Sequence, residues 1–335
     1  MTSFDTRATS TQTTLDELAK QLLDNLGADA ERILRNDTSI YVVGSGGRGE
    51  MSEHSDVDLF VARVGRSTSD VDAFLVRQAI ARTLYAMKRP DPSQGGAFLK
   101  MHTDASLCDR MGTAEDDAEN TFTARMLLLL ESQALLGEAA YAELLDRVLE
   151  AYWKDAATHA SDYHPYVLVN DVVRYWRSLL LNYVAKNAKK AKELRAPERR
   201  HGERELRSYK LRFSRCLSCF SVLASLLVLT GRGGVRKDDV RALVRRRPIE
   251  RLRDIGEARA GTEAAAYVDK LLALYDGFLT TTNAPTKDLE AKFGEIEFTK
   301  AKLDEGYAFG DAMFDLLQVL GREGRARNLF RYMVV

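Results

Sequence analysis

Two short stretches near the start of the chain, residues 39–43 and 58–64, are dense in apolar and β-branched residues. Their alternation predicts strands, because successive side chains of a strand point to opposite faces. A third extended stretch is predicted at residues 97–107, and from residue 113 onward the apolar spacing is almost wholly helical. The pattern therefore predicts an α+β chain, with a small mixed β-sheet followed by a large α-helical domain.

The predicted helices begin at capping residues and end at glycine or proline. Thr14 and Glu17 have the spacing of a capping box ahead of the first helix. Helices are expected over residues 14–26, 71–87, 113–136, 139–159, 165–183, 206–229, 236–260, 262–279 and 298–320. This order divides the chain into a sheet-containing domain over residues 1–112 and an α-helical domain over residues 113–335.

The length of 335 residues leaves room for two domains. The net charge is zero, but residues 1–165 carry 16 Lys and Arg against 27 Asp and Glu, or −11, which leaves +11 for the remainder. Residues 174–253 alone hold 23 basic and 7 acidic side chains. An acidic half beside a basic half suits the binding of a polyanion, and solvated helix faces would produce the same imbalance.

Neither a membrane span nor a disulfide framework is expected. No apolar run approaches the roughly 20 residues that cross a bilayer, and the first residues lack the features of a secretory signal. Cys216 and Cys219 lie in an apolar helical stretch without a second pair, so buried thiols are favoured over a zinc site. We expect a cytoplasmic protein without membrane contact.

The first two predicted strands carry the residues with the clearest chemistry. Gly44 and Ser45 follow the first strand, and Asp56 and Asp58 stand two apart where the second begins, so both carboxylates face one way. Convergent carboxylates suit one or two Mg²⁺ or Mn²⁺ ions that also bind substrate phosphates. A glycine turn such as 44–47 can bring backbone N–H groups against those phosphates.

The string GSGGRGEMSEHSDVDLFV resembles the DNA polymerase β nucleotidyltransferase superfamily. It is most similar to the branch of bacterial uridylyltransferases that modify the nitrogen-regulatory PII protein, and the resemblance covers roughly residues 38–137. It implies a nucleotidyltransferase catalytic core at 1–112, with the α-helical domain at 113–335 closing the nucleotide cleft. Gly44, Ser45, Gly46 and Arg48 are then expected to hold the phosphates of an NTP.

The resemblance also implies a third carboxylate on a strand beside the aspartate pair, acting as general base or metal ligand. Asp104 is the candidate for this role, with Asp109 as the alternative. The sequence departs from the uridylyltransferase pattern here, and an Asp104 that only faces solvent is the competing interpretation. His54 and His102 lie close enough in the sequence to touch a ligand or to orient a carboxylate.

The helical part carries basic strips at helical spacing, one with Arg174 and Arg177 and one with Lys210, Arg212 and Arg215. In superfamily members with helical appendages such strips flank the nucleotide cleft, so Arg174, Lys210 and Arg215 are expected nucleotide-binding residues. The alternative is an ordinary exposed amphipathic surface.

The expected activity is transfer of NMP from an NTP or dNTP to an acceptor hydroxyl, with release of pyrophosphate. The acceptor is expected to be a nucleotide, an oligonucleotide or an RNA end, as in toxins and antiviral messenger synthases of the superfamily, because half of the chain is basic. A protein hydroxyl that receives UMP or AMP is the first alternative. An inactive nucleotide-binding scaffold is the second.

Overall fold

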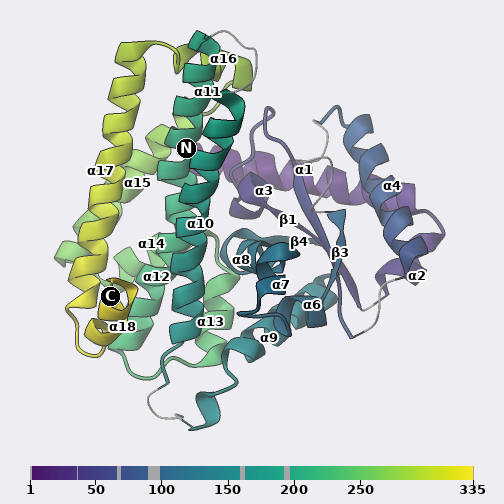
Figure 1. Cartoon of the computed structure of the whole chain (residues 1–335), viewed down its shortest axis with the longest axis horizontal. Helices are drawn as coiled ribbons and strands as arrows, with labels where there is room; N and C mark the ends of the chain where they lie inside the picture. Colours follow the sequence, from purple (N-terminus) through teal and green to yellow (C-terminus); the bar gives the residue numbers. More distant parts are fainter. Residues whose placement is uncertain are drawn as a thin grey trace. The chain divides into compact units, whose positions relative to one another are not determined.

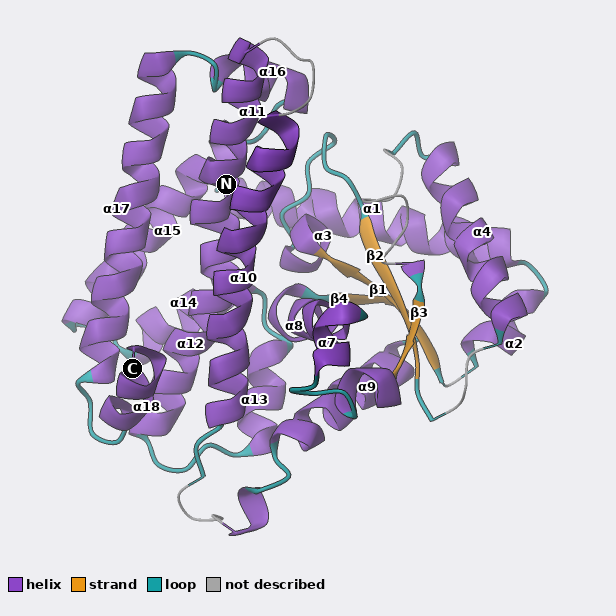
Figure 2. Ribbon diagram, in the orientation of Figure 1, coloured by secondary structure: helices purple, strands orange, loops and turns teal. Residues whose placement is uncertain are grey.

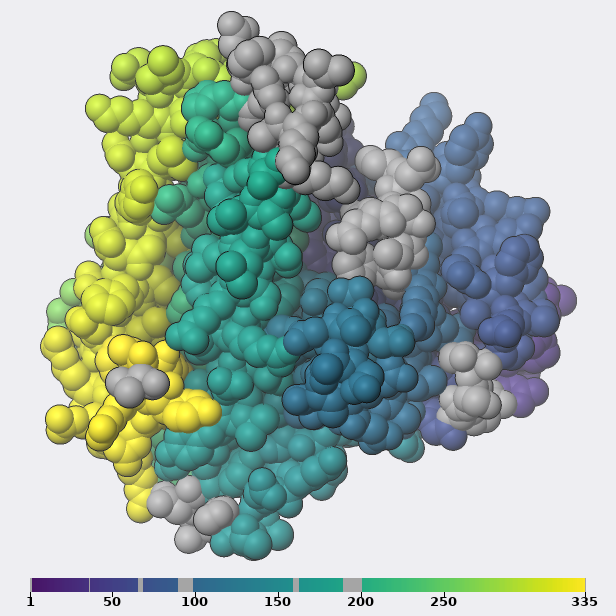
Figure 3. Space-filling view, in the orientation of Figure 1, coloured from purple at the N-terminus to yellow at the C-terminus, as the bar shows by residue number. Residues whose placement is uncertain are grey.

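The computed structural model describes residues 2–35, 37–65, 69–89, 99–158, 163–191 and 197–334, with the side chains of residues 189–191 and 197–200 left out. The chain forms two compact units, Met1–Ala157 and Thr158–Val335. They are coloured purple to blue and teal to yellow in Figure 3. The boundary between them lies later than the predicted division at residues 112 and 113, because the segment after residue 113 adds a strand to the sheet of the first unit. The roles assigned to the two domains stay predictions.

The first unit contains a four-stranded sheet in the order β3-β2-β1-β4 (Figure 2). Its strands are β1 (Thr38–Val43), β2 (Asp58–Arg63), β3 (Met101–Thr103) and β4 (Gln133–Leu136). β1 pairs antiparallel with both β2 and β4, whereas β2 and β3 are parallel. The sheet is therefore mixed, and the predicted α+β class is confirmed.

Helices cover the two faces of this sheet (Figure 1). Their bounds are α1 (Ser3–Leu26), α2 (Asp29–Leu34), α3 (Gly44–Arg48), α4 (Asp70–Ala86), α6 (Asp104–Cys108), α7 (Ala114–Ala118), α8 (Thr121–Glu131) and α9 (Glu138–Tyr152). On one face the apolar sides of α1 and α4 bury Ile40, Val42, Leu59 and Val61 in a single core. On the other face Tyr41 stacks on Phe60 and contacts Tyr141 of α9. Asp58 shares this second face with Phe60, because side chains alternate along β2.

Three predicted elements of the first unit differ from the structure. The first helix begins at Ser3, where Thr2 and Asp5 form a capping box, and the predicted capping box at Thr14 lies inside it. In the described part of the predicted strand 97–107, residues 99–107, the strand extends only over β3, and the last residues belong to α6. The predicted helix 113–136 ends at Glu131 because the following residues pair with the free edge of β1 as β4.

The second unit is helical throughout its described residues. Its helices are α10 (Tyr166–Ala191), α11 (Pro197–Lys210), α12 (Cys216–Gly231), α13 (Lys237–Val244), α14 (Pro248–Ala258), α15 (Glu263–Thr281), α16 (Thr286–Lys292), α17 (Ile296–Gly321) and α18 (Ala326–Val334). Helix α12 is the central one, with α10, α14, α17 and α18 packed around it. Nearly all of its side chains are buried, Cys216 and Cys219 among them as free thiols.

A π-helical turn, Leu211–Arg215, joins α11 to α12. Within the described residues, the continuous helix His201–Gly231 is the one stretch long and apolar enough to cross a membrane, judged by length and composition alone. Of its most apolar window, 83% is buried inside the structure, which is the pattern of a core helix. Phe213, in the π-helical turn, contacts Tyr209, Tyr275, Phe278 and Phe309 and so anchors the turn in an aromatic cluster.

Candidate active site

The glycine turn and the aspartate pair meet at one end of the sheet. Val43, the last residue of β1, pairs with Asp58, the first residue of β2, and Gly44 follows directly. A Cβ on Gly44 would lie 3.3 Å from the Asp58 Oδ2 atom, so this carboxylate lies directly beside the turn. Asp58 is half-buried at the start of β2, and Asp56 is exposed in the loop that leads into this strand. The structure thus brings together the two motifs that the sequence separates by ten residues.

The backbone of the turn requires glycine. Gly44 has a φ of 65°, in the left-handed region that side chains disfavour. A Cβ on Gly47 would lie 1.9 Å from the carbonyl oxygen of Glu131, so this glycine lets α3 pack directly against the end of α8. Gly44, Ser45 and Gly46 form the first turn of α3, where helical N–H groups have no partner within the helix. These groups are donors at the end of the sheet where Asp58 lies.

The N-terminal helix holds the loop between α3 and the aspartate pair. The Arg7 guanidinium donates to the carbonyl oxygen of Glu50 at 3.0 Å, and the N–H of Met51 donates to the Thr11 hydroxyl at 2.8 Å. Both side chains are buried, with 7% of Arg7 and none of Thr11 exposed. Sequence reasoning missed these two residues, because they stand in a polar segment without helical periodicity. The capping-box spacing of Thr2 and Asp5 was the signal that could have placed them on a helix.

The later part of the loop, residues 52–55, is held by hydrogen bonds within its own turn and by Arg89, three residues after the end of α4. The N–H of Ser52 donates to the Ser55 hydroxyl at 3.0 Å, and the N–H of Ser55 returns to the Ser52 carbonyl at 3.1 Å. The Arg89 guanidinium donates to the carbonyl oxygens of Glu53 at 3.0 Å and Ser55 at 3.3 Å. The residue immediately before Asp56 is therefore fixed from two sides.

Arg48, predicted to hold a phosphate, forms ion pairs with two carboxylates in the structure. Its Nε lies 2.7 Å from a carboxylate oxygen of Glu50, and its Nη1 lies 2.6 Å from one of Glu131. All three side chains are at most 7% exposed, and the carboxylates neutralise the arginine. Through these ion pairs Arg48 connects α3 to α8 and stabilises the glycine turn.

Asp104, the predicted third carboxylate, lies beside Gly65, at the other end of β2 from Asp58. It follows β3, whose last residue pairs with Arg63, and its carboxylate accepts the N–H of Gly65 at 3.2 Å. Gly65 stands seven residues after Asp58, which places Asp104 roughly 20 Å from that carboxylate at about 3.3 Å per strand residue. Asp104 instead pairs with Arg147 at 2.6 Å and connects β3 to α9. Asp109, the alternative, ends α6 and lies still further along the chain.

The two histidines differ in environment. His102 is 5% exposed on β3 and stacks on Phe60, and burial lowers its pKa to about 4. A neutral imidazole inside the sheet face is a packing residue. His54 is more exposed and lies 3.2 Å from the Glu53 carboxylate, in the loop before the aspartate pair.

The donors present suit a magnesium or manganese ion in chemical type. Asp56 and Asp58 supply the hard oxygen ligands that such ions prefer, and bound phosphates supply more. Among the residues that the structure describes, no group of three or more His, Cys, Asp or Glu side chains could hold a metal ion.

The predicted basic residues of the helical part all belong to the second unit. Arg174 is half-buried and lies 3.9 Å from Asp171. Lys210 is exposed at the end of α11, and Arg215 is half-buried at the end of the π-helical turn. Arg212, between them, lies 4.1 Å from the ring centre of Tyr307 and is committed to that contact.

Residues 20–72 match the family model of the nucleotidyltransferase domain, which is polymerase β-like. The matched segment runs from α1 through β1, α3 and β2 into the start of α4, and so contains the glycine turn and both aspartates. No curated protein matches the chain. The match supports nucleotidyl transfer as the general activity and supports a transferase of the nucleotidyltransferase kind.

Proposed function

We propose that the chain is a metal-dependent nucleotidyltransferase that moves NMP from an NTP or dNTP to an acceptor hydroxyl. The observation that carries the proposal is the position of the Asp58 carboxylate directly beside Gly44, with Asp56 two residues away in the sequence. The N–H groups that donate hydrogen bonds to phosphates then lie next to the carboxylates that bind the metal. Phosphoryl transfer requires both kinds of group at one place.

In the reaction, the acceptor oxygen forms a bond to the α-phosphorus while the bond from the α-phosphorus to the oxygen that bridges it to the β-phosphate breaks; pyrophosphate leaves, and the hydroxyl proton passes to solvent water. The first-turn N–H groups of α3 and the Ser45 hydroxyl hold the β- and γ-phosphates. Asp56 and Asp58 would hold one or two Mg²⁺ ions, which supply positive charge where negative charge develops on the transferred group. Asp104 is not proposed for the proton transfer, because of its position beside Gly65.

For the acceptor we propose a nucleotide, an oligonucleotide or an RNA end. The support is the excess of 11 basic residues in residues 166–335, where 33 Lys and Arg stand against 22 Asp and Glu. Several of these cations are committed to carboxylates within the second unit, as Arg207 is to Glu203 and Arg246 to Asp254. The net excess of positive charge attracts phosphates of any nucleotide sequence. It therefore favours a phosphate-containing class of acceptor and does not identify a particular one.

A protein hydroxyl is the alternative acceptor. Its support is the similarity of GSGGRGE and SDVDL to the branch that modifies the PII protein. An inactive scaffold is disfavoured because the glycine turn and both aspartates are present together.

Incubation with each α-labelled NTP and dNTP in the presence of Mg²⁺ or Mn²⁺ tests the proposal. The label is then resolved on single-stranded RNA, on free nucleotides and on added proteins. We expect label on RNA or on a nucleotide, and pyrophosphate release that matches it. Label on protein alone would replace the proposed acceptor by the alternative. Absence of label and of pyrophosphate with every substrate would contradict nucleotidyl transfer itself.

A further inference from the structure

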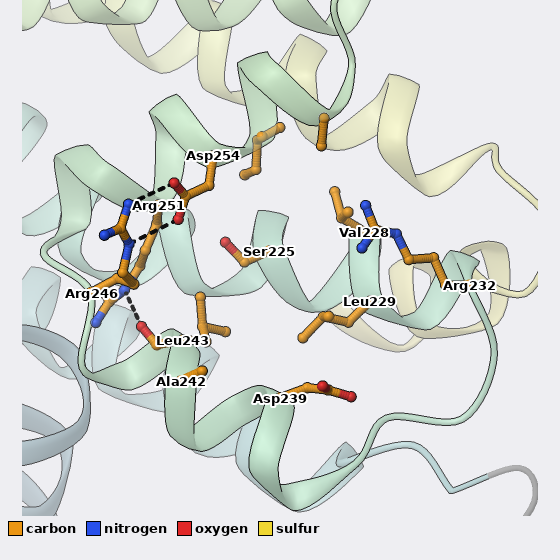
Figure 4. A pocket seen from close by; sticks show the side chains of 12 residues that line it. Ser225, Val228, Leu229, Arg232, Asp239, Ala242, Leu243, Arg246, Arg251 and Asp254 are labelled. Carbon is orange, nitrogen blue, oxygen red and sulfur yellow. Dashed lines mark hydrogen bonds and ion pairs between the residues drawn. The ribbon is translucent and has the colours of Figure 1, made fainter.

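The second unit contains a pocket of about 290 Å³ between α12, α13 and α14 (Figure 4). Protein interiors are close-packed, and voids larger than a water molecule are few. The volume lies at the small end of the roughly 300–1,000 Å³ range typical of ligand sites. All of the lining residues belong to the second unit, so the pocket does not depend on the placement of the first.

The pocket has a buried apolar floor and an exposed mouth. Val228 and Ile255, at 7% and 3% exposure, form the floor with the half-buried side chains of Leu229 and Leu243. Ala242 is exposed at the mouth. Apolar walls offer water few hydrogen-bond partners. Burial of an apolar group against them is favourable by about 25 cal/mol for each Å² of apolar surface removed from water.

The charged side chains of the pocket lie at its edges, as Figure 4 shows for Arg232 on one side and the pair Arg246–Asp254 on the other. Arg246 and Asp254 form two hydrogen bonds, at 3.0 and 2.7 Å, so each is neutralised by the other. Asp239 is held in the same way by Arg236, at 3.0 and 2.9 Å. Arg251, 1% exposed, donates to the carbonyl oxygens of Leu243 and Val244 at the end of α13.

Arg232 differs from these residues. It is exposed and ends α12 at the C-cap, and the pKa of the Asp239 carboxyl is lowered by its hydrogen bonds from Arg236 and also by the charge of Arg232. The Arg246–Asp254 pair is neutral, and Arg251 is buried against carbonyl oxygens. Arg232 and Arg236, in contrast, share the single carboxylate of Asp239, which leaves one positive charge there. The surplus charge therefore stands at the mouth, above an apolar floor.

We propose that this pocket binds a small monoanionic ligand with a compact apolar body. The apolar body occupies the floor between α12 and α14, and the anionic group pairs with Arg232 at the mouth. The ligand is a small organic acid or sulfonate in chemical class. This site is separate from the proposed transfer chemistry, and its test does not require an active enzyme.

Titration of the full chain with 1-naphthoate, followed by calorimetry and saturation-transfer NMR, tests the proposal. The neutral 1-naphthamide and the cationic 1-naphthylmethylammonium have the same apolar body and serve as comparison ligands. We expect naphthoate to bind more tightly than the amide, and the ammonium compound to bind least. Added salt should weaken the binding of naphthoate and leave that of the amide unchanged.

Two variants locate the site. Ala242→Trp covers the mouth and should abolish binding of naphthoate. Arg232→Glu should weaken it about fivefold or more, because an exposed pair is worth up to about a factor of five and the new charge repels the ligand. Arg322→Glu, at the C-cap of α17 and outside the pocket, is the matched control and should change nothing.

Other outcomes would contradict the proposal. Binding that persists in Ala242→Trp, or no binding by any of the three compounds, would overturn the pocket as a ligand site. Equal affinity for naphthoate and naphthamide, or an unchanged affinity in Arg232→Glu, would overturn the anionic class. Far-UV circular dichroism and the unfolding midpoint establish that each variant is folded, and the exposed positions chosen favour this outcome.

Discussion

The hydrogen bond between Thr11 and Met51 predicts that a helix outside the glycine–aspartate motif controls the activity. Valine has nearly the shape of threonine, so Thr11→Val removes the acceptor and leaves the packing almost unchanged. The Met51 N–H is then buried without its 2.8 Å partner. A buried donor left unsatisfied costs about 1–3 kcal/mol. For a protein of this size each kcal/mol lowers the unfolding midpoint by about 2–4 °C.

The activity should fall by more than this loss of stability explains. The loop from Glu50 to Ser55 leads directly to Asp56, and a displacement of about 1 Å at a reacting group can cost on the order of a hundredfold in rate. We expect kcat for NTP consumption to drop at least tenfold, measured well below the unfolding midpoint. The assays are thermal unfolding and steady-state pyrophosphate release.

Thr13→Val is the matched control for this prediction. Thr13 lies two residues further on the same helix, is exposed, and donates its hydroxyl to the carbonyl of Thr9 at 3.1 Å, as Thr11 does to that of Arg7 at 2.8 Å. It makes no contact with the loop that the structure records. If Thr11→Val behaves like Thr13→Val in both midpoint and kcat, α1 does not position the aspartate loop.

Three further predictions concern the turn, the packing of the first unit and the basic helices. Gly44→Val should raise KM for NTP and lower kcat, because φ at this position is 65° and the new side chain meets Asp58. Arg125→Met should lower the free energy of unfolding by about 3–5 kcal/mol at pH 7, because it leaves the Asp116 carboxylate buried without its 2.6 Å partner. The affinity for single-stranded RNA should fall with salt along a line of log K against log salt concentration. Replacing Lys210 and Arg215 by alanine should make the slope of this line shallower, by about 0.7 for each lost phosphate contact.

Matched controls accompany the first and the third of these predictions. Gly112→Val has a similar φ, 76°, and open space around it, so it should reduce stability without affecting KM. Alanine at Arg322 and Arg327, two exposed positions, should leave the salt slope unchanged. Equal KM values for the two valine variants, or equal slopes for the two alanine pairs, would contradict the roles assigned to the turn and to the basic helices.

The effect of Arg125→Met should depend on pH. Burial acts to raise the pKa of Asp116, but hydrogen bonds from Arg125 and Thr121 outweigh it, so the pKa lies below its ordinary value. The pair therefore contributes its stability above the unfolded pKa of about 3.9, and loses it as pH falls through the lower folded pKa. In the variant the buried carboxyl takes up a proton more readily, so the cost should shrink between pH 7 and pH 4. Urea unfolding at both values measures it, and an equal cost at both would contradict the ion pair's role.

The sequence predicts those features that depend on local pattern. The alternation at 39–43 and 58–64 predicts both central strands, and the glycine turn and the aspartate pair follow from their places at the strand ends. The structure adds the pairing of Val43 with Asp58, which converts a spacing of ten residues into a contact. Pattern alone was sufficient here because each feature lies within one element or at its boundary.

The failures arise where tertiary contacts decide. Gln133–Leu136 continues an apolar helical run, yet the open edge of β1 recruits it as a strand. Arg48 stands beside the glycines in sequence, but its partner Glu131 is 83 residues away and nothing in the local pattern indicates it. Asp104 was assigned by alternation along a strand that in fact ends at Thr103. The structures of Gln133–Leu136, Arg48 and Asp104 depend on partners distant in the sequence, which the local pattern does not reveal.

The central claim is that Asp56 and Asp58 form the metal-binding centre of a nucleotidyl transfer reaction. Its most direct test is Mg²⁺- or Mn²⁺-dependent pyrophosphate release by the double variant Asp56→Asn with Asp58→Asn. Its charge-matched control is Asp16→Asn with Asp24→Asn, two exposed positions on α1. We predict that the Asp56 and Asp58 variant keeps its fold and loses Mn²⁺ binding and product formation by at least a hundredfold, since metal-held charge is worth several kcal/mol. The control should match the unmodified chain. Undiminished pyrophosphate release by the folded Asp56 and Asp58 variant would contradict the claim.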